Sequence, residues 1–151
     1  LHLCDRRQRQ MCIRDRCNIN LEITESALME DKTNLLDNMN RLMEYGVKFS
    51  LDDFGTGHSN LNYIVDMPVN IVKFDKGMLD AYFENGRAKY VMDAAMHMIQ
   101  GMNLEIVAEG IETKEHFENI AKLGINFVQG YYFSKPVTAR QFLLFINENN
   151  K

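Results

Sequence analysis

The alternation of strand-like and helix-like segments from residue 18 onward limits what this chain can fold into. Five segments combine apolar alternation with β-branched or aromatic residues, and they span residues 18–24, 47–51, 71–75, 104–110 and 125–134. The segments between them are long enough for the crossover connections that parallel strands require. The pattern therefore predicts an α/β fold with a parallel sheet built from right-handed units.

Apolar residues at helical spacing fill the segments between the expected strands. We expect helices over residues 32–46, around 61–64, over 87–101, from 114 to 123 and from 139 onward. Thr113 is expected to cap the fourth of these helices, and Thr138 with Gln141 forms a capping box for the fifth. The helix over 87–101 carries an apolar stripe, which we expect to pack in the core rather than form a methionine-rich binding groove. This stripe consists of Val91, Met92, Ala95, Met96, Ile99 and Met102.

Two adjacent carboxylates, Asp52 and Asp53, follow the strand expected over residues 47–51. The pair is therefore expected at a strand end, and Gly55 and Gly57 would let the next loop fold back over it. For an isolated Asp-Gly stretch, a turn or a helix cap is the simpler interpretation. The other strand ends decide between the two interpretations.

Polar side chains recur near the carboxyl ends of all five expected strands. Side chains alternate between the two faces of a strand, so each of these residues lies opposite the apolar face. The five residues are Glu22, Asp52, Lys73, Glu109 and Gln129. Parallel α/β proteins bind their ligands at these strand ends.

Three carboxylates that share one space repel each other unless a cation holds them together, and oxygen ligands of this kind suit Mg²⁺ or Mn²⁺. We expect Asp53 to reach the same space because the strand turns there. A structural ion pair is the alternative for any single buried Glu or Lys.

Charge and hydropathy exclude several classes of protein. The formal net charge of −4 argues against binding a DNA or RNA polymer by bulk charge. No apolar run approaches the roughly 18 residues of a membrane span, and the start of the chain does not have the pattern of a signal peptide. We therefore expect a cytoplasmic protein with no membrane segment in this chain.

Residues 1–17 differ from the rest of the chain. They contain five arginines and all three cysteines, with neither strand alternation nor a helical apolar stripe. We expect a disordered or non-native basic segment over 1–17, followed by one domain over 18–151; a basic arm that binds a partner is the alternative.

Five motifs give this domain a specific resemblance. In chain order they are NLEITES, LDDFGTGHSNLNYI, IVKFDK, IVAEGIET and VQGYYFSKP. Together they closely resemble the successive motifs of the EAL domain, the bacterial cyclic di-GMP phosphodiesterase. The resemblance implies a TIM-like (β/α) barrel with two Mg²⁺ or Mn²⁺ ions at its mouth, which hydrolyses cyclic di-GMP to linear pGpG.

The resemblance also implies a role for each matching residue. Glu22, Asp52, Asp53 and Glu109 resemble the metal ligands of the family, and Glu109 also resembles the residue that serves as, or with, the base.

Four further residues match positions around the metals. Lys73 resembles the lysine that orients the attacking water, and Glu25 the glutamate that braces the loop after the aspartates. Glu112 resembles the partner that supports Glu109, and Gln129 the glutamine that hydrogen-bonds in the site.

The sequence departs from the family pattern before residue 18, where neither the Glu-Ala-Leu motif nor the ligand asparagine is present. The stretch ESAL at 25–28 carries an inserted serine and belongs to a later motif. Because a complete barrel needs about 250 residues, we expect the C-terminal half or so of an EAL barrel, inactive by itself.

Three functions stay open for such a domain. The first is a truncated cyclic di-GMP phosphodiesterase, and the second is a degenerate module that binds cyclic di-GMP or a protein without hydrolysis. The third is an unrelated metal-dependent barrel enzyme acting on a phosphorylated sugar. A homodimer and upstream GGDEF or sensor domains are compatible with the first two.

Overall fold

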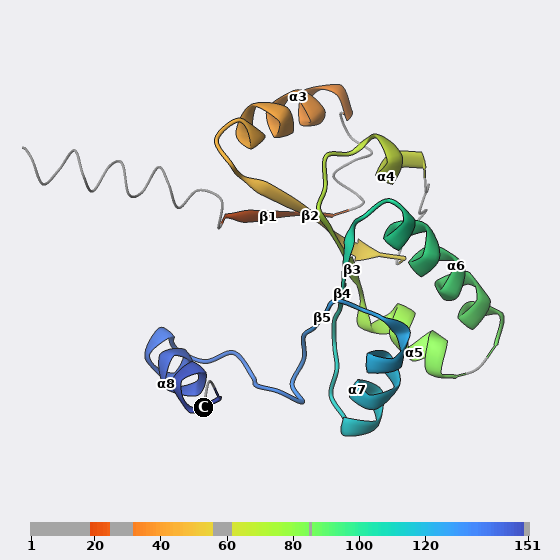
Figure 1. Cartoon of the computed structure of the whole chain (residues 1–151), viewed down its shortest axis with the longest axis vertical. Coiled ribbons are helices and arrows are strands. Elements are labelled where there is room, and N and C mark those ends of the chain that lie inside the picture. The colour runs from red at the N-terminus through yellow and green to blue at the C-terminus, as the bar shows by residue number, and fades with distance from the viewer. Residues whose placement is uncertain (1–18, 25–31, 56–61, 85, 150–151) are drawn as a thin grey trace, which may run out of the picture.

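The computed structural model describes residues 19–24, 32–55, 62–84 and 86–149. Its strands form one five-stranded sheet in the order β1-β2-β3-β4-β5, and every neighbouring pair is parallel (Figure 1). The strands are β1 (Asn20–Thr24), β2 (Lys48–Phe54), β3 (Ile71–Phe74), β4 (Glu105–Ala108) and β5 (Phe127–Val128). Parallel strands in sequential order are the arrangement of a TIM-like barrel wall, so the predicted fold class is confirmed.

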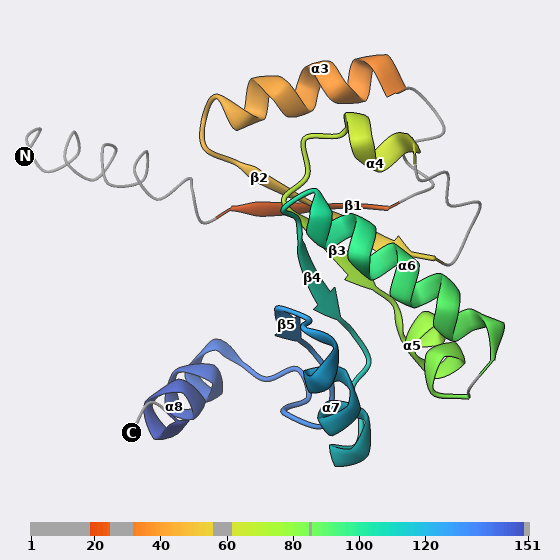
Figure 2. The ribbon, with the colours of Figure 1, turned by 45° about the vertical axis from the view of Figure 1, so that its right-hand side comes forward.

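Helices connect the successive strands. They are α3 (Lys32–Met43), α4 (Asn62–Asp66), α5 (Lys76–Phe83), α6 (Arg87–Gly101), α7 (Lys114–Ile120), the 3₁₀ helix η2 (Ala121–Leu123) and α8 (Ala139–Asn149). Helix α8 lies apart from the other helices at the end of an extended segment (Figure 2). None of the helices in the described ranges has the length and apolar character needed to cross a membrane.

The core lies between the sheet and the helices that follow its strands. Val72, Phe74 and Ile106 are completely buried on β3 and β4. Burial of each such side chain contributes about 1.5–3 kcal/mol. From the helices, Met39, Leu79, Met92, Ala95, Met96 and Ile99 complete the same cluster. The expected core packing of α6 is confirmed for Met92, Ala95, Met96 and Ile99, whereas Val91 at the edge of the stripe is 66% exposed.

Several local predictions hold in atomic detail. The Thr113 hydroxyl accepts from the backbone N–H of His116 at 3.1 Å, as expected of a helix cap. Thr138 and Gln141 form the predicted capping box, with the Thr138 N–H donating to Gln141 Oε1 at 3.0 Å. Helix α3, in contrast, ends at Met43 rather than at 46 as expected, and Gly46 closes the following turn with a left-handed φ of 82°.

The expected end of the second strand before the aspartates is wrong. Strand β2 continues through Asp52 and Asp53 to Phe54, which pairs with Phe74 of β3. The register shifts between Leu51 and Phe54, and Asp53 has a φ of 55°, so the aspartates occupy an irregularity inside the strand. The aromatic pair Phe54–Phe74, with ring centroids 5.6 Å apart, supports the resumed pairing.

Helix α5 was not expected from the sequence. Asp75 caps it by accepting from the backbone N–H groups of Gly77 at 2.8 Å and Met78 at 3.0 Å. The sequence does not reveal Asp75 as a helix cap, because Asp75 also fits the end of the preceding strand. Gly77 further weakens the helical pattern. The last strand is also shorter than expected, because the chain turns at Gly130 after only two paired residues.

The loops after β4 and β5 are tied together by backbone contacts. The Ile111 N–H donates to the Gln129 carbonyl at 3.1 Å, and the Tyr132 N–H donates to the Ile111 carbonyl at 2.9 Å. A Cβ atom on Gly130 would overlap the backbone of Ile111. Only glycine therefore allows the two loops to approach this closely.

Lys76, at the start of α5, fastens the β4 loop from the other side. Its aliphatic stem lies against Gly110, which has a φ of 72°, and its Nζ atom donates to Glu112 Oε1 at 2.7 Å. The hydrogen bond to Lys76 holds the pKa of Glu112 below its ordinary value.

We predict that Gly130→Ala lowers the free energy of unfolding by about 2 kcal/mol, because backbone atoms must move to admit the methyl group. Urea denaturation measures the change. The control is Gly101→Ala at the end of α6, where nothing lies within 4 Å of the added Cβ. That variant is expected to be neutral or to stabilise by up to about 1 kcal/mol. An equal effect of both substitutions would contradict the close approach of the two loops.

We also predict that Lys76→Met raises the pKa of Glu112, measured from its side-chain carboxyl resonance in an NMR titration. Because the pKa of Glu112 is lower in the folded than in the unfolded chain, its ionised form stabilises the fold at pH values above the unfolded-state pKa. This stabilisation is lost as the pH falls through the folded-state pKa. The wild type should therefore lose more stability than the variant on acidification through this range. An unchanged Glu112 titration would show that the ion pair does not persist in solution.

Candidate functional site

Lys73 lies at the centre of the candidate site, in contact with three carboxylates from three other strands or strand ends. Its Nζ atom is 2.9 Å from Glu22 Oε1, 2.9 Å from Asp52 Oδ1 and 2.8 Å from Glu109 Oε1. The residue is only 7% exposed. Four of the five polar residues expected at the strand ends are therefore brought together.

The parallel register places these side chains together. In β3, Val72 and Phe74 are buried in the core, so Lys73 between them points to the opposite face. Glu109 follows β4 directly, and its backbone N–H donates to the Phe74 carbonyl at 3.0 Å, which fixes it beside Lys73.

The electrostatics keep Lys73 charged. Burial acts to lower the pKa of its ammonium, but the contacts with Glu109, Glu22 and Asp52 outweigh this and raise the pKa well above its ordinary value. One ammonium against three carboxylates leaves an excess of negative charge if all three are ionised. The cluster can therefore attract a further cation.

Asp52 carries an oxygen that Lys73 does not satisfy. Its Oδ1 atom is buried and lies 2.9 Å from Lys73 Nζ, but among the described residues it has no contact with good hydrogen-bonding angles. A buried carboxylate oxygen in this state is expected to have a partner, which in other proteins is often an ion or a water molecule. Its chemistry, with that of Glu22 and Glu109, fits a hard divalent cation such as Mg²⁺ or Mn²⁺. Within the described part of the chain, however, no three His, Cys, Asp or Glu residues are already arranged as metal ligands.

The remaining predicted residues lie around this cluster or outside the described ranges. Glu112 pairs with Lys76 at the rim. Asp53 is exposed, and its backbone is in the left-handed conformation with a φ of 55°. Gln129 follows β5, and its backbone N–H donates to the Ala108 carbonyl at 2.8 Å, one residue before Glu109. Glu25 and Gly57 lie outside the described residues.

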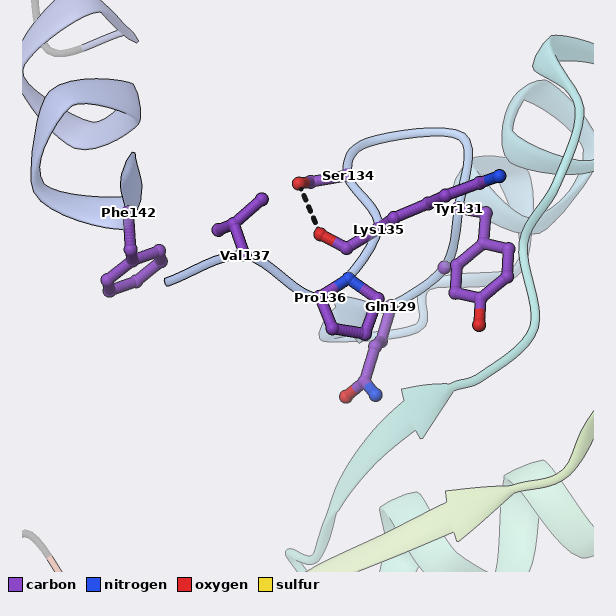
Figure 3. Close-up of a pocket in the computed structure, with 8 residues that line it drawn as sticks. Gln129, Tyr131, Ser134, Lys135, Pro136, Val137 and Phe142 are labelled. Carbon is purple, nitrogen blue, oxygen red and sulfur yellow. Dashed lines mark hydrogen bonds between the residues drawn. The ribbon is translucent and has the colours of Figure 1, made fainter. Parts of the chain in front are cut away.

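A hollow of about 340 Å³ opens beside Gln129 (Figure 3). It is lined by Gln129, Gly130, Tyr131, Ser134, Lys135, Pro136, Val137 and Phe142. The Lys135 ammonium lies 5.8 Å from the centre of the Tyr131 ring, close enough for a cation–π contact. Apart from Gln129, these residues were given no role in a site from the sequence, although most of them lie in the motif VQGYYFSKP. The run Tyr131-Tyr132-Phe133 was counted as strand, although aromatic residues after a strand end are also a binding signal.

Comparisons with known proteins connect this geometry to a family. A model of the EAL domain matches residues 6–136. The oxygen sensor protein DosP of Escherichia coli K12 is 41% identical over 123 residues, which are 82% of this chain and 15% of DosP. PdeG of the same organism, named a probable cyclic di-GMP phosphodiesterase, is 36% identical over 80% of this chain and 24% of its own length.

A solved structure of an EAL enzyme has the same fold as this chain. The EAL enzyme Bd1971, described in its cAMP- and cyclic di-GMP-bound form, superposes with a TM-score of 0.80 at 37% identity. The match covers 87% of this chain and 35% of that one. This chain thus spans less than a quarter of the length of the two curated relatives. The matched motifs, the parallel sheet and the shared residues show that the chain belongs to the EAL domain family.

Proposed function

We propose that the cluster around Lys73 is the catalytic centre of a cyclic di-GMP phosphodiesterase, which forms linear pGpG. The observation that carries this proposal is the convergence of Glu22, Asp52 and Glu109 on one ammonium at the carboxyl ends of the strands. The names of relatives such as PdeG support the choice of substrate. We also propose that the protein is cytoplasmic, and that residues 18–151 form the EAL part of the chain while residues 1–17 lie outside it.

Glu22, Asp52, Asp53 and Glu109 would hold the divalent metal, Mg²⁺ or Mn²⁺, with two ions in the complete domain. When bound, such ions lower the pKa of a coordinated water so that it can attack phosphorus near neutral pH. Asp52 is the best placed of these ligands because its buried Oδ1 atom still needs a partner. The irregularity in β2 gives the adjacent Asp53 a backbone direction that a regular strand would not allow.

Lys73 and Glu109 would act on the substrate itself. The Lys73 ammonium stays charged at neutral pH and can offset the negative charge that develops on the phosphoryl oxygens. Glu109 is fixed by its backbone hydrogen bond to β3 and is partly exposed, so it can accept a proton from the attacking water. Glu112, held by Lys76, would support the loop that carries Glu109.

The hollow beside Gln129 would receive part of the nucleotide. Its volume of about 340 Å³ lies at the lower end for ligand sites. The ring of Tyr131 offers a stacking surface, the Lys135 ammonium suits a phosphate, and the Gln129 amide can hydrogen-bond a base or ribose. Because Gln129 is tied to the strand that precedes Glu109, the hollow and the cluster share one rim.

Binding without hydrolysis is the second candidate function. The observation that favours it is the hollow lined by Gln129, Tyr131 and Lys135, which offers contacts to a nucleotide that need no metal. The partners proposed for either function are cyclic di-GMP, a second copy of the chain, and GGDEF or sensor domains elsewhere in a longer protein. The small share of the curated relatives that this chain covers is consistent with such neighbours.

We predict that, in protein carrying the complete EAL domain, Glu109→Gln lowers pGpG formation by about 100-fold or more, the usual effect of removing a general base. Chromatography of cyclic di-GMP incubated with Mn²⁺ measures the product. The matched control is Glu118→Gln on α7, a surface glutamate that pairs with Lys114, which should keep wild-type turnover.

Three results would decide between the functions. Wild-type turnover by the Glu109→Gln variant would remove Glu109 from the mechanism. Saturable binding of cyclic di-GMP with no turnover by the wild type would favour the binding module. Release of phosphate from sugar monoesters, with cyclic di-GMP left intact, would support the unrelated barrel enzyme.

A further inference from the structure

We propose that Lys73 is an internal counter-cation that competes with the divalent metal for the oxygens of Glu22, Asp52 and Glu109. Metal binding then releases the Lys73 ammonium toward the substrate phosphate. The inference rests on the proposed metal-dependent function, and it adds a conformational change that the roles described above do not require.

The first argument is the sharing of ligand atoms. The three contacts of Lys73 are to the carboxylates of three of the four proposed metal ligands. An ammonium and a metal ion cannot use the same carboxylate lone pairs. Because Mg²⁺ lies about 2.1 Å from its oxygen ligands, an ion bound to one of these oxygens would lie within about 5 Å of Nζ if Lys73 kept its contact.

The second argument is electrostatic. With Lys73 in place, the three carboxylates still carry an excess of negative charge, which attracts a divalent cation. Once bound, that cation repels the ammonium. At this separation the repulsion weakens metal affinity by about a factor of ten, even at the dielectric constant of water. The metal therefore weakens the contacts that hold Lys73.

The third argument separates this arrangement from a permanent structural ion cluster. A finished buried cluster satisfies its polar atoms, because an unpaired buried acceptor costs stability. Asp52 Oδ1 is buried and lies 2.9 Å from Nζ, but the angles of this contact are poor for a hydrogen bond, so within the described residues the oxygen has room for a better-directed cation. The Lys73 side chain has a flexible four-carbon stem that can move its ammonium while the backbone stays fixed in β3.

Binding of Mn²⁺ alone, without nucleotide, tests the proposal in the chain and in its Lys73→Met variant. Isothermal titration calorimetry should show about tenfold tighter binding by the variant, because the competing charge is gone. The matched control is Lys114→Met, which removes the same charge from the surface of α7 and leaves Glu118 without this partner, and its affinity should stay within about twofold of wild type. If Lys73→Met binds Mn²⁺ equally well or more weakly than the wild type, the competition proposed here is wrong but the proposed function stands. If none of the three proteins binds Mn²⁺, both the competition and the proposed function are wrong.

A measurement on the wild type covers the case in which Lys73→Met does not fold. The ammonium protons of Lys73 can be followed in ¹H–¹⁵N spectra during addition of Mg²⁺. We expect their exchange with water to accelerate at least tenfold on metal binding, while the signal of Lys76 does not change. Unchanged exchange of Lys73 at saturating Mg²⁺ would show that it keeps its three carboxylates, and the inference would fail.

Discussion

The contact of one buried ammonium with three carboxylates is the interaction on which the rest of the site depends. Burying charges is costly unless they are paired, and Lys73 is paired by residues from β1, β2 and the end of β4. These partners are distant in sequence, and only the parallel register of the sheet brings them to one point. The sheet therefore does more than support the site, because an altered strand register would leave Lys73 among groups that cannot satisfy it.

The neighbouring loops fix the outer part of the site by a different means, which is close backbone contact. Gly130 lets the loop after β5 lie against Ile111, and this contact holds Gln129 next to the strand that precedes Glu109. Lys76 completes the arrangement by holding Glu112. Strand register thus positions the charged centre, whereas glycines and one exposed ion pair position the rim. Lys73 at the centre is buried, whereas Lys76 and Glu112 at the rim are about half exposed.

The alternation of side chains along the strands is enough to predict the central cluster from the sequence. Period-two parity placed Lys73 opposite Val72 and Phe74, and the structure has the same arrangement. Parity does not extend to Asp53, where β2 has a register shift and a left-handed residue. Neither feature is visible in an apolar pattern. The helix at Lys76–Phe83 was missed for a related reason, since Asp75 ends one element and caps the next. The hollow beside Gln129 depends on how the segment after β5 returns, which local sequence does not determine.

Geometry and family membership answer different questions about the chemistry. Carboxylates around a cation are consistent with many metal-dependent hydrolases, so the cluster alone does not choose between a phosphodiester and a phosphate monoester. Membership of the EAL family and the name of the relative PdeG are the grounds on which a cyclic dinucleotide is proposed. Lys73 has a part both in the carboxylate cluster and in the proposed reaction. In the proposed function, an ammonium that offsets part of the carboxylate charge before metal binding, and the phosphate charge after it, would let the centre stay folded without a metal and react once a metal is bound. The same residue would thus serve stability in one state and catalysis in the other, which explains why a lysine with a mobile ammonium, rather than a rigid arginine, suits this position.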